Sequence, residues 1–76
     1  MAGAECWYRV VYWDGSRSRF LGRVHDVAAH RSALDPFRSW LLLDGVRDGE
    51  LVLVDEATGH AVARRFLRPP RRLPPG

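Results

Sequence analysis

The side chains that could hold a metal ion are few and poorly spaced. Cys6, His25, His30 and His60 are the sulfur and nitrogen donors, and Asp26 adds a carboxylate. His25 and His30 are five residues apart, which is about 140° around a helix, so they do not share a helical face. The sequence contains no paired cysteines and no H-x-x-x-H spacing. The pattern predicts ordinary surface histidines and no metal site.

The sequence also offers little support for a hydrolytic site. His30, Ser32 and Asp35 lie close together in the chain, and Cys6 could act with a histidine. A catalytic triad is defined by its geometry, for which closeness in sequence is no evidence. The chain lacks a G-x-S-x-G motif, a Gly-rich phosphate loop and paired catalytic carboxylates. We therefore predict that the protein is not an enzyme and uses no cofactor.

The most suggestive side chains are tyrosines and arginines that a β-hairpin would place on one face. They are Tyr8, Tyr12, Arg17, Arg19 and Arg23. Aromatic rings interleaved with cations can stack on nucleic-acid bases while the arginines contact phosphates. The same set is typical of a solvated strand face on which each Arg lies over a Tyr ring. A protein interface is the third interpretation, and we predict these five residues as the partner-binding residues.

Charge is unevenly distributed along the chain. Residues 1–63 contain seven Arg and nine acidic residues, whereas residues 64–76 contain five Arg and no acid. The body of the chain therefore lacks the basic excess of a dedicated nucleic-acid-binding domain. Acidic residues between positions 44 and 56 could neutralise the hairpin arginines within the monomer or in a dimer. We predict a non-enzymatic protein-interaction module of unknown partner. The alternative is a nucleic-acid-binding domain that uses the Arg/Tyr hairpin face and the basic tail.

These side chains are positioned by a predicted hairpin near the start of the chain. Residues 7–13 form a β-branched and aromatic run, Asp14–Gly15 predicts a tight turn, and residues 16–24 return. With a two- or four-residue loop, alternation assigns one face to the core and one to solvent, although a three-residue loop with a bulge moves Phe20 to the other face. The predicted core face contains Trp7, Val11, Trp13, Phe20 and Val24. The predicted solvent face contains Tyr8, Val10, Tyr12, Arg17, Arg19, Leu21 and Arg23.

The segment between residues 25 and 45 has two interpretations. Asp35–Pro36 is typical of an N-cap followed by Pro at the first helical position, and Gly45 can end a helix. Apolar side chains recur between them at helical spacing, at Phe37, Trp40 and Leu41. A strand over residues 38–43 is the alternative, but it leaves about a dozen residues as loop, which is uncommon in a compact domain.

A second hairpin follows, and it completes the predicted fold. Residues 51–54 form a strand, residues 55–59 a turn, and residues 60–67 the returning strand. The predicted fold class is α+β, a small ββαββ domain with one antiparallel sheet and a middle helical segment. A five-stranded SH3-like β-barrel is the alternative. The predicted core is Trp7, Val11, Trp13, Phe20, Phe37, Trp40, Leu41, Val52, Leu53, Val54, Val62 and Phe66.

Chain length and composition set the remaining expectations. We predict one globular domain over residues 1–67 and a disordered Pro/Arg-rich tail over residues 68–76. A single cysteine excludes an intrachain disulfide and favours a reducing compartment, so we expect a cytoplasmic protein. The sequence contains no run of about 18 apolar residues, so it predicts no membrane span. A four-stranded sheet this small has two edges and leaves much apolar area near the surface. We therefore also predict self-association as a dimer.

Overall fold

The structure is a computed structural model in which residues 6–68 are described. Its sheet has four strands in the order β2-β1-β3-β4, and each strand is antiparallel to its neighbours. The strands are β1 (Trp7–Trp13), β2 (Ser18–His25), β3 (Glu50–Asp55) and β4 (Ala61–Phe66). The two hairpins are therefore joined through β1 and β3, which form the centre of the sheet.

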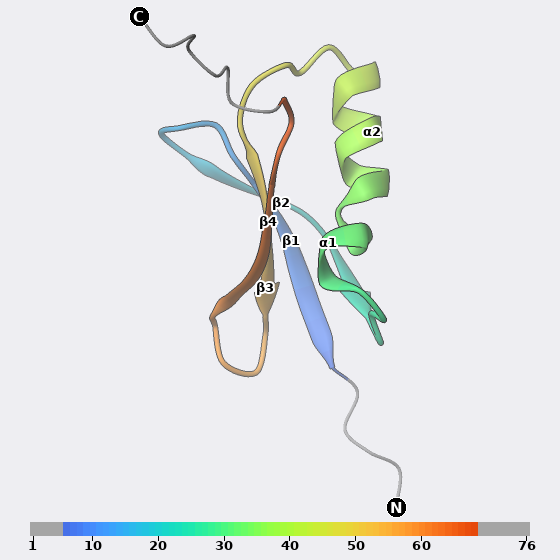
Figure 1. Ribbon diagram of the computed structural model, residues 1–76. Coiled ribbons are helices and arrows are strands. Elements are labelled where there is room, and N and C mark those ends of the chain that lie inside the picture. The colour runs from blue at the N-terminus through green and yellow to red at the C-terminus, as the bar shows by residue number, and fades with distance from the viewer. Residues whose placement is uncertain (1–5, 69–76) are drawn as a thin grey trace, which may run out of the picture.

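The segment between the hairpins is helical and lies against one face of the sheet (Figure 1). It comprises α1 (His30–Ala33) and α2 (Asp35–Leu43), with Leu34 between them. This arrangement confirms the predicted ββαββ α+β fold, and the barrel alternative is wrong because residues 38–43 belong to α2. None of the helices in the described part of the chain is long and apolar enough to cross a membrane.

The start of α2 differs in one detail from its prediction. Pro36 lies in the first turn, where its missing N–H leaves no helical hydrogen bond unmade. Asp35 is the first helical residue and not the N-cap, and no side chain caps this end. The Asp35 carboxylate instead forms an ion pair with Arg65 of β4, at 2.8 Å. This ion pair links the helix to the sheet.

The end of α2 follows the expectation for Gly45. Its φ of +94° is a left-handed conformation that suits glycine. The Gly45 N–H donates to the Leu42 carbonyl and the Val46 N–H donates to the Leu41 carbonyl, at 3.1 and 3.0 Å. These two bonds form a Schellman motif, which satisfies carbonyls at the end of the helix. The chain thereby reverses and returns toward β3.

The hydrophobic core lies between the helices and the sheet. Tyr8 and Val10 of β1 and Leu51 and Leu53 of β3 point toward the helices. They pack with side chains from the helical segment and from the residue that follows β4. The complete buried set is Tyr8, Val10, Leu34, Leu41, Leu51, Leu53 and Leu67.

The predicted core is right at two positions and wrong at others. Leu41 and Leu53 are buried, whereas four predicted core rings are exposed: Trp13, Phe20, Trp40 and Phe66. The remaining predicted core residues are half-buried. Trp13 and Trp40 are 40% and 53% exposed, so removing either ring is expected to cost less than removing a buried one.

The exposure of Trp13 and Phe20 results from a reversal of the predicted faces of the first hairpin. Tyr8 and Val10 are on the covered face of β1, although the alternation of the sequence had been interpreted the other way. β1 is apolar on both faces, and Arg9 distinguishes them. A guanidinium in the middle of a central strand would be costly to bury beneath a helix. Helices therefore cover the face that Arg9 does not occupy.

The β1–β2 connection has four residues, and β2 contains a bulge. Asp14 accepts hydrogen bonds from the N–H groups of Ser16 and Arg17, both at 2.8 Å, and these stabilise the turn. Val10 pairs with Gly22 but Val11 pairs with Phe20, so the register shifts by one residue. The four-residue connection keeps Phe20 on the same face as Val11, and the shift changes the face only of the residues that follow Leu21. The shift thereby places Val24 opposite Tyr8, on the covered face, whereas the predicted hairpin has Val24 on the same face as Trp7.

The predicted domain boundary lies between Leu67 and Arg68, the last two residues that the structure describes. Leu67 is fully buried, and its N–H donates to the Gly49 carbonyl at 3.0 Å. Arg68 follows at the surface and forms an ion pair with Asp48, at 2.7 Å. The rest of the predicted tail, residues 69–76, lies outside the described residues, so the predicted tail over 68–76 stays a prediction.

Candidate interaction face

The sheet face opposite the helices is uncovered in the described structure. In Figure 1 it faces left, and the β1–β2 turn leans toward the same side. We call it the open face, and the strand register defines its members by rows that cross the sheet. The first two rows are His25–Trp7 and Arg23–Arg9–Val54–Ala61. The other two are Phe20–Val11–Val52–Arg64 and Ser18–Trp13–Glu50–Phe66.

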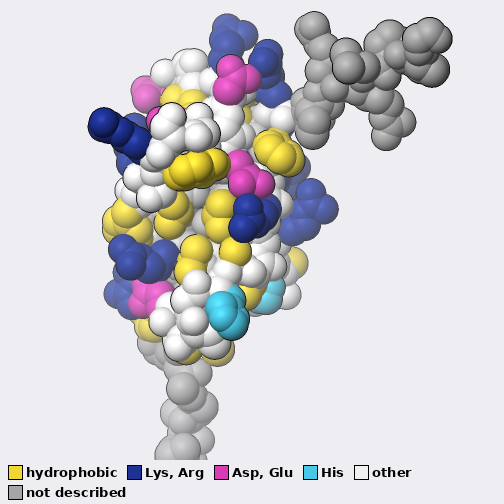
Figure 2. Space-filling view, turned by 90° about the vertical axis from the view of Figure 1, so that its left-hand side faces the viewer, with side chains coloured by type: hydrophobic (Ala, Val, Ile, Leu, Met, Phe, Trp, Pro, Cys, Tyr) yellow, Lys and Arg dark blue, Asp and Glu magenta, His cyan; other side chains and the backbone are white. Residues whose placement is uncertain are grey.

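Apolar side chains occupy the middle of the open face and large rings surround them. Figure 2 shows this gathering of apolar side chains, with charged groups between and around them. Val11, Val52 and Val54 line a shallow hollow of about 310 Å³, together with Trp13 and polar neighbours. Trp13 is 40% exposed, and Phe20 and Phe66 are each 51% exposed. The face is therefore a low centre of valines between protruding rings.

A second hollow continues from the first at the end of the sheet. It has a volume of about 330 Å³, and Trp13, Glu50 and Phe66 line it with residues of the adjacent loops. Trp13 and Glu50 line both hollows. The concave part of the open face therefore extends from the centre of the sheet to the β1–β2 turn.

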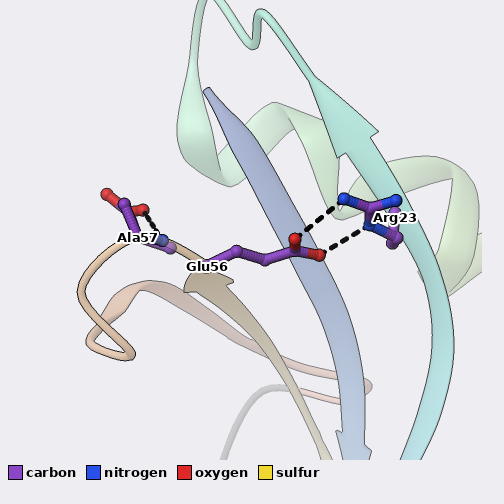
Figure 3. A network of polar contacts seen from close by, with 4 residues as sticks. Arg23, Glu56 and Ala57 are labelled. Atoms are coloured by element: carbon purple, nitrogen blue, oxygen red, sulfur yellow. Dashed lines mark hydrogen bonds and ion pairs between the residues drawn. The ribbon is translucent and has the colours of Figure 1, made fainter. Parts of the chain in front are cut away.

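Two arginines of the open face, Arg23 and Arg64, are paired with acidic side chains of the same chain. Arg23 of β2 forms a bidentate pair with Glu56, with Nε–Oε2 and Nη2–Oε1 distances of 2.7 and 2.8 Å. Figure 3 shows that the Glu56 side chain extends across β1 to reach it. Arg64 contacts Glu50 at 3.3 Å. Docking of another molecule over Arg23 or Arg64 therefore need not bring an unpaired charge out of water.

Two arginines also cover aromatic rings on this face. The Arg23 guanidinium lies 4.2 Å from the centre of the Trp7 ring, and that of Arg9 lies 4.8 Å from the centre of the Phe20 ring. His25 packs against Trp7 with a ring-centre distance of 4.5 Å. Cation–π contacts of this kind hold the guanidinium groups flat on the surface.

The Arg23–Glu56 pair also changes the acidity of both groups. The hydrogen bonds from Arg23 lower the pKa of the Glu56 carboxyl, and the same bonds raise the pKa of the Arg23 guanidinium. A charge-assisted bidentate bond favours the charged form of both partners. The pair therefore persists under more acidic conditions than an isolated Glu would allow.

The five predicted partner-binding residues do not form one surface. Tyr8 is 8% exposed and Tyr12 is half-buried, both on the covered face, where burial raises the pKa of each phenol. Arg19 is exposed and pairs across the strands with Tyr12, and Arg17 lies in the turn. Only Arg23, among the five, belongs to the open face. The prediction of a shared Tyr/Arg stacking face is therefore wrong, because Tyr8 is in the core.

The tyrosine hydroxyls reach polar partners at the margins of the core. The Tyr12 hydroxyl donates to the Asp48 carbonyl at 2.5 Å, and that of Tyr8 lies 3.3 Å from Nε2 of His30. A buried phenol needs such a partner for its O–H group. The signal that identifies the open face in the sequence is instead Arg9, which alternates with Trp7 and Val11 on a central strand.

The residues considered for catalysis and metal binding are occupied elsewhere. His30 contacts Tyr8, Asp35 pairs with Arg65, and His25 lies 3.0 Å from the Asp26 carboxylate. Within residues 6–68 no three His, Cys, Asp or Glu side chains lie together in a way that could hold a metal ion.

Another apolar groove, of similar volume to the two hollows, lies on the other side of the molecule. Leu21, Pro36, Phe37 and Trp40 line it between β2 and α2, and its volume is about 320 Å³. Trp40 is its most prominent exposed residue, at 53%. This groove involves one strand and one helix, whereas the open face extends over all four strands.

Comparison of the chain with protein-family models, curated proteins and solved structures found no match. What the open face can do therefore has to follow from its own chemistry. That chemistry is an apolar centre, protruding rings and arginines that already have acidic or aromatic partners.

Proposed function

We propose that this protein is a non-enzymatic interaction module that binds an apolar protein surface through its open face. One observation carries the proposal. Apolar side chains gather on an uncovered sheet face, while Arg23 and Arg64 beside them are paired with acids and Arg9 lies over Phe20. These side chains are Trp7, Val11, Trp13, Phe20, Val52, Val54 and Phe66. Contiguous apolar patches on a folded surface are typical of interaction sites.

The rings supply most of the expected binding energy. If about 100 Å² of each of Trp13, Phe20 and Phe66 is covered, burial contributes on the order of 7 kcal/mol at about 25 cal/mol per Å². Association itself costs several kcal/mol in lost translational and rotational freedom. The apolar surface of the partner is buried at the same time and contributes a similar amount, and a net binding free energy of about 8 kcal/mol corresponds to a dissociation constant of about 1 µM. We therefore expect affinity in the micromolar range.

The same geometry argues against a nucleic-acid surface. A base stacks on an accessible ring face, but guanidinium groups already lie over Trp7 and Phe20. A phosphate contacting Arg23 would have to replace the bidentate Glu56 carboxylate, which is a strong partner. Both features favour a protein partner with an apolar surface.

A reducing compartment such as the cytoplasm is part of the proposal. Cys6 is exposed and is a free thiol in the structure. Disulfides are rare where glutathione keeps thiols reduced, and an exposed free cysteine is compatible with such a compartment.

The test compares two charge substitutions on opposite sides of the molecule. Val52→Glu places a carboxylate in the centre of the open face, opposite Arg64, where the cross-strand ion pair helps the strand to form. Leu43→Glu is the control, because Leu43 is 88% exposed at the end of α2. Tagged versions of both variants and of the wild type are recovered from the source cell after cross-linking, and bound proteins are quantified by mass spectrometry.

We expect Val52→Glu to reduce specific partners at least about tenfold, the equivalent of about 1.4 kcal/mol, while Leu43→Glu retains them. Equal recovery by all three proteins would contradict the proposal. A parallel fluorescence-anisotropy titration with single- and double-stranded oligonucleotides at about 50 mM salt tests the alternative. Binding with a salt slope of about −3, as four phosphate contacts on a single strand produce, would overturn the protein-partner proposal.

A further inference from the structure

We propose that a second copy of this chain occupies the open face, so that two sheets pack face to face in a symmetric dimer. This inference rests on the proposed function, because it identifies the protein partner of the same face. Three features carry it: the construction of the sheet edges, the area of the face and the placement of its charges.

The sheet edges are poorly suited to pairing with another chain. Both edge strands contain a bulge, since Leu21 of β2 and Val62 of β4 have no partner in the register. Arginines also lie along both edges, with Arg19 on β2 and Arg65 on β4 among them. Bulges and charged side chains are features that prevent edge-to-edge association. Self-association through the sheet therefore has to use its face.

The area of the face matches a weak but specific dimer. Four strands about 4.8 Å apart, with about seven residues at about 3.3 Å each, cover a projected area of about 400 Å². Protruding rings increase the accessible area, so two copies together bury on the order of 1,000 Å². Specific interfaces begin near this size, and the smallest ones are the weakest. We expect a dissociation constant in the micromolar range.

The rows of the open face are complementary to themselves. Consider a two-fold axis that runs parallel to the strands between β1 and β3, with the sheets about 10 Å apart. This axis places β1 over β3 of the second copy and β2 over its β4. Val11 then meets Val52 of the second copy in the centre of the interface. The valine hollow of each copy is covered by apolar side chains of the other.

The charges fit the same arrangement. Arg64 faces Phe20 of the second copy, an apolar ring that Arg9 of that copy also contacts. Arg9 faces Val54 and Arg23 faces Ala61 of the second copy, and Glu50 faces Trp13. None of these four charged side chains in the rows therefore opposes a charge of the same sign. Closed two-fold symmetry requires this kind of self-complementary patch.

The test is sedimentation velocity on the full chain between about 1 µM and about 500 µM, a range that brackets a micromolar equilibrium. The wild type and Leu43→Glu should shift from the 8.7 kDa monomer toward twice that mass as concentration rises. Val52→Glu should raise the dissociation constant at least about tenfold. Phe20→Ser, at an exposed ring, is a second variant in case Val52→Glu does not fold, as circular dichroism will report.

A monomer mass at every concentration would overturn the dimer but leave the proposed function to the cell-based comparison. A dimer that neither Val52→Glu nor Phe20→Ser weakens would also overturn the inference, because its interface would lie elsewhere. The purified chain could stay monomeric while Val52→Glu loses partners from the source cell. That result would overturn the dimer and identify a different protein as the occupant of the open face.

Discussion

The two faces of β1 differ in chemistry more than in hydrophobicity. The covered face presents Tyr8, Val10 and Tyr12, and the open face presents Trp7, Arg9, Val11 and Trp13. Both contain large aromatic rings. Phenol hydroxyls at the margins of the core find partners in His30 and the Asp48 carbonyl, whereas a guanidinium in mid-strand has no comparable site beneath a helix. The position of the polar atoms therefore decides which face is covered.

The two faces therefore have different roles: the covered face stabilises the monomer, and the open face is the proposed binding surface. The fully buried side chains come from the helices, the covered face and Leu67, so most of the stability of the monomer depends on them. The open face leaves its rings exposed and contributes less to the folding of a single copy. Substitutions on adjacent residues of one strand should then have very different consequences.

The largest expected effect is the contrast between Leu53→Ala and Val52→Ala. Leu53 is fully buried, so its truncation should lower the free energy of unfolding by about 2–5 kcal/mol. Val52 is half-buried on the open face, and its truncation should cost about 1 kcal/mol or less. Urea unfolding at a protein concentration well below the dissociation constant of the proposed dimer measures both. Equal losses would mean that the two faces are not distinct.

Gly49→Ala should have the next largest effect, because Gly49 closes one margin of the covered face. Its φ is +117°, and an added Cβ would collide with the Tyr12 ring and lie 2.8 Å from the Trp13 carbonyl. We expect a loss of about 1–3 kcal/mol from strain and overpacking.

The matched control for Gly49 is Gly59→Ala. Gly59 also has a positive φ, of +76°, but an added Cβ there meets no atom within 4 Å. This substitution should cost only the left-handed penalty of about 1 kcal/mol. If thermal unfolding gave the same loss for both variants, the close approach of Gly49 to Tyr12 would be refuted.

A smaller effect is expected for Tyr12→Phe. The substitution removes the hydrogen bond to the Asp48 carbonyl but keeps the ring, so the expected loss is about 0.5–1.5 kcal/mol. Chemical denaturation should detect it. An unchanged midpoint would show that the hydroxyl partner does not help to select the covered face.

The smallest effect concerns pH and the open face. The pKa of Glu56 is lowered in the folded state by Arg23, so this contact stabilises the fold at pH values above the unfolded pKa of about 4.5. The contribution is lost as the pH falls through the lower, folded pKa. Glu56→Gln should therefore be less stable than the wild type at neutral pH, and the two proteins should converge in acid. A difference that stays constant from neutral pH to about pH 3 would contradict this assignment.

The strands and helix of the fold could be predicted from local signals. Asp14–Gly15 marks the first turn, Pro36 and Gly45 bracket α2, and the β-branched runs mark the strands. Each signal acts through the backbone over a few residues, so no tertiary information is needed. The order of the strands was not predicted, because either strand of one hairpin can pair with either strand of the other.

The candidate site could not be predicted in the same way, because it depends on which face of the sheet the helix covers. Alternation shows that Tyr8 and Trp7 point to opposite sides but not which side is buried. The bulge at Leu21 then moves Arg23 to the side of Trp7, and Gly22, a glycine within the strand, is the local sign of that bulge. Arg9 was the one indication in the sequence of which face the helix covers, because burying its charge beneath a helix would be costly.

The most direct test of the open face is an NMR titration of the full chain with valine and leucine methyl groups labelled. Unlabelled wild-type chain is added until the total concentration is about 1 mM, well above a micromolar dissociation constant. We predict concentration-dependent shifts at Val11, Val52 and Val54, with Leu43 unchanged. Val52→Glu chain added in place of the wild type should cause little change. Shifts confined to the helical side, or none at any concentration, would contradict the assignment of the open face as the surface that binds a second copy.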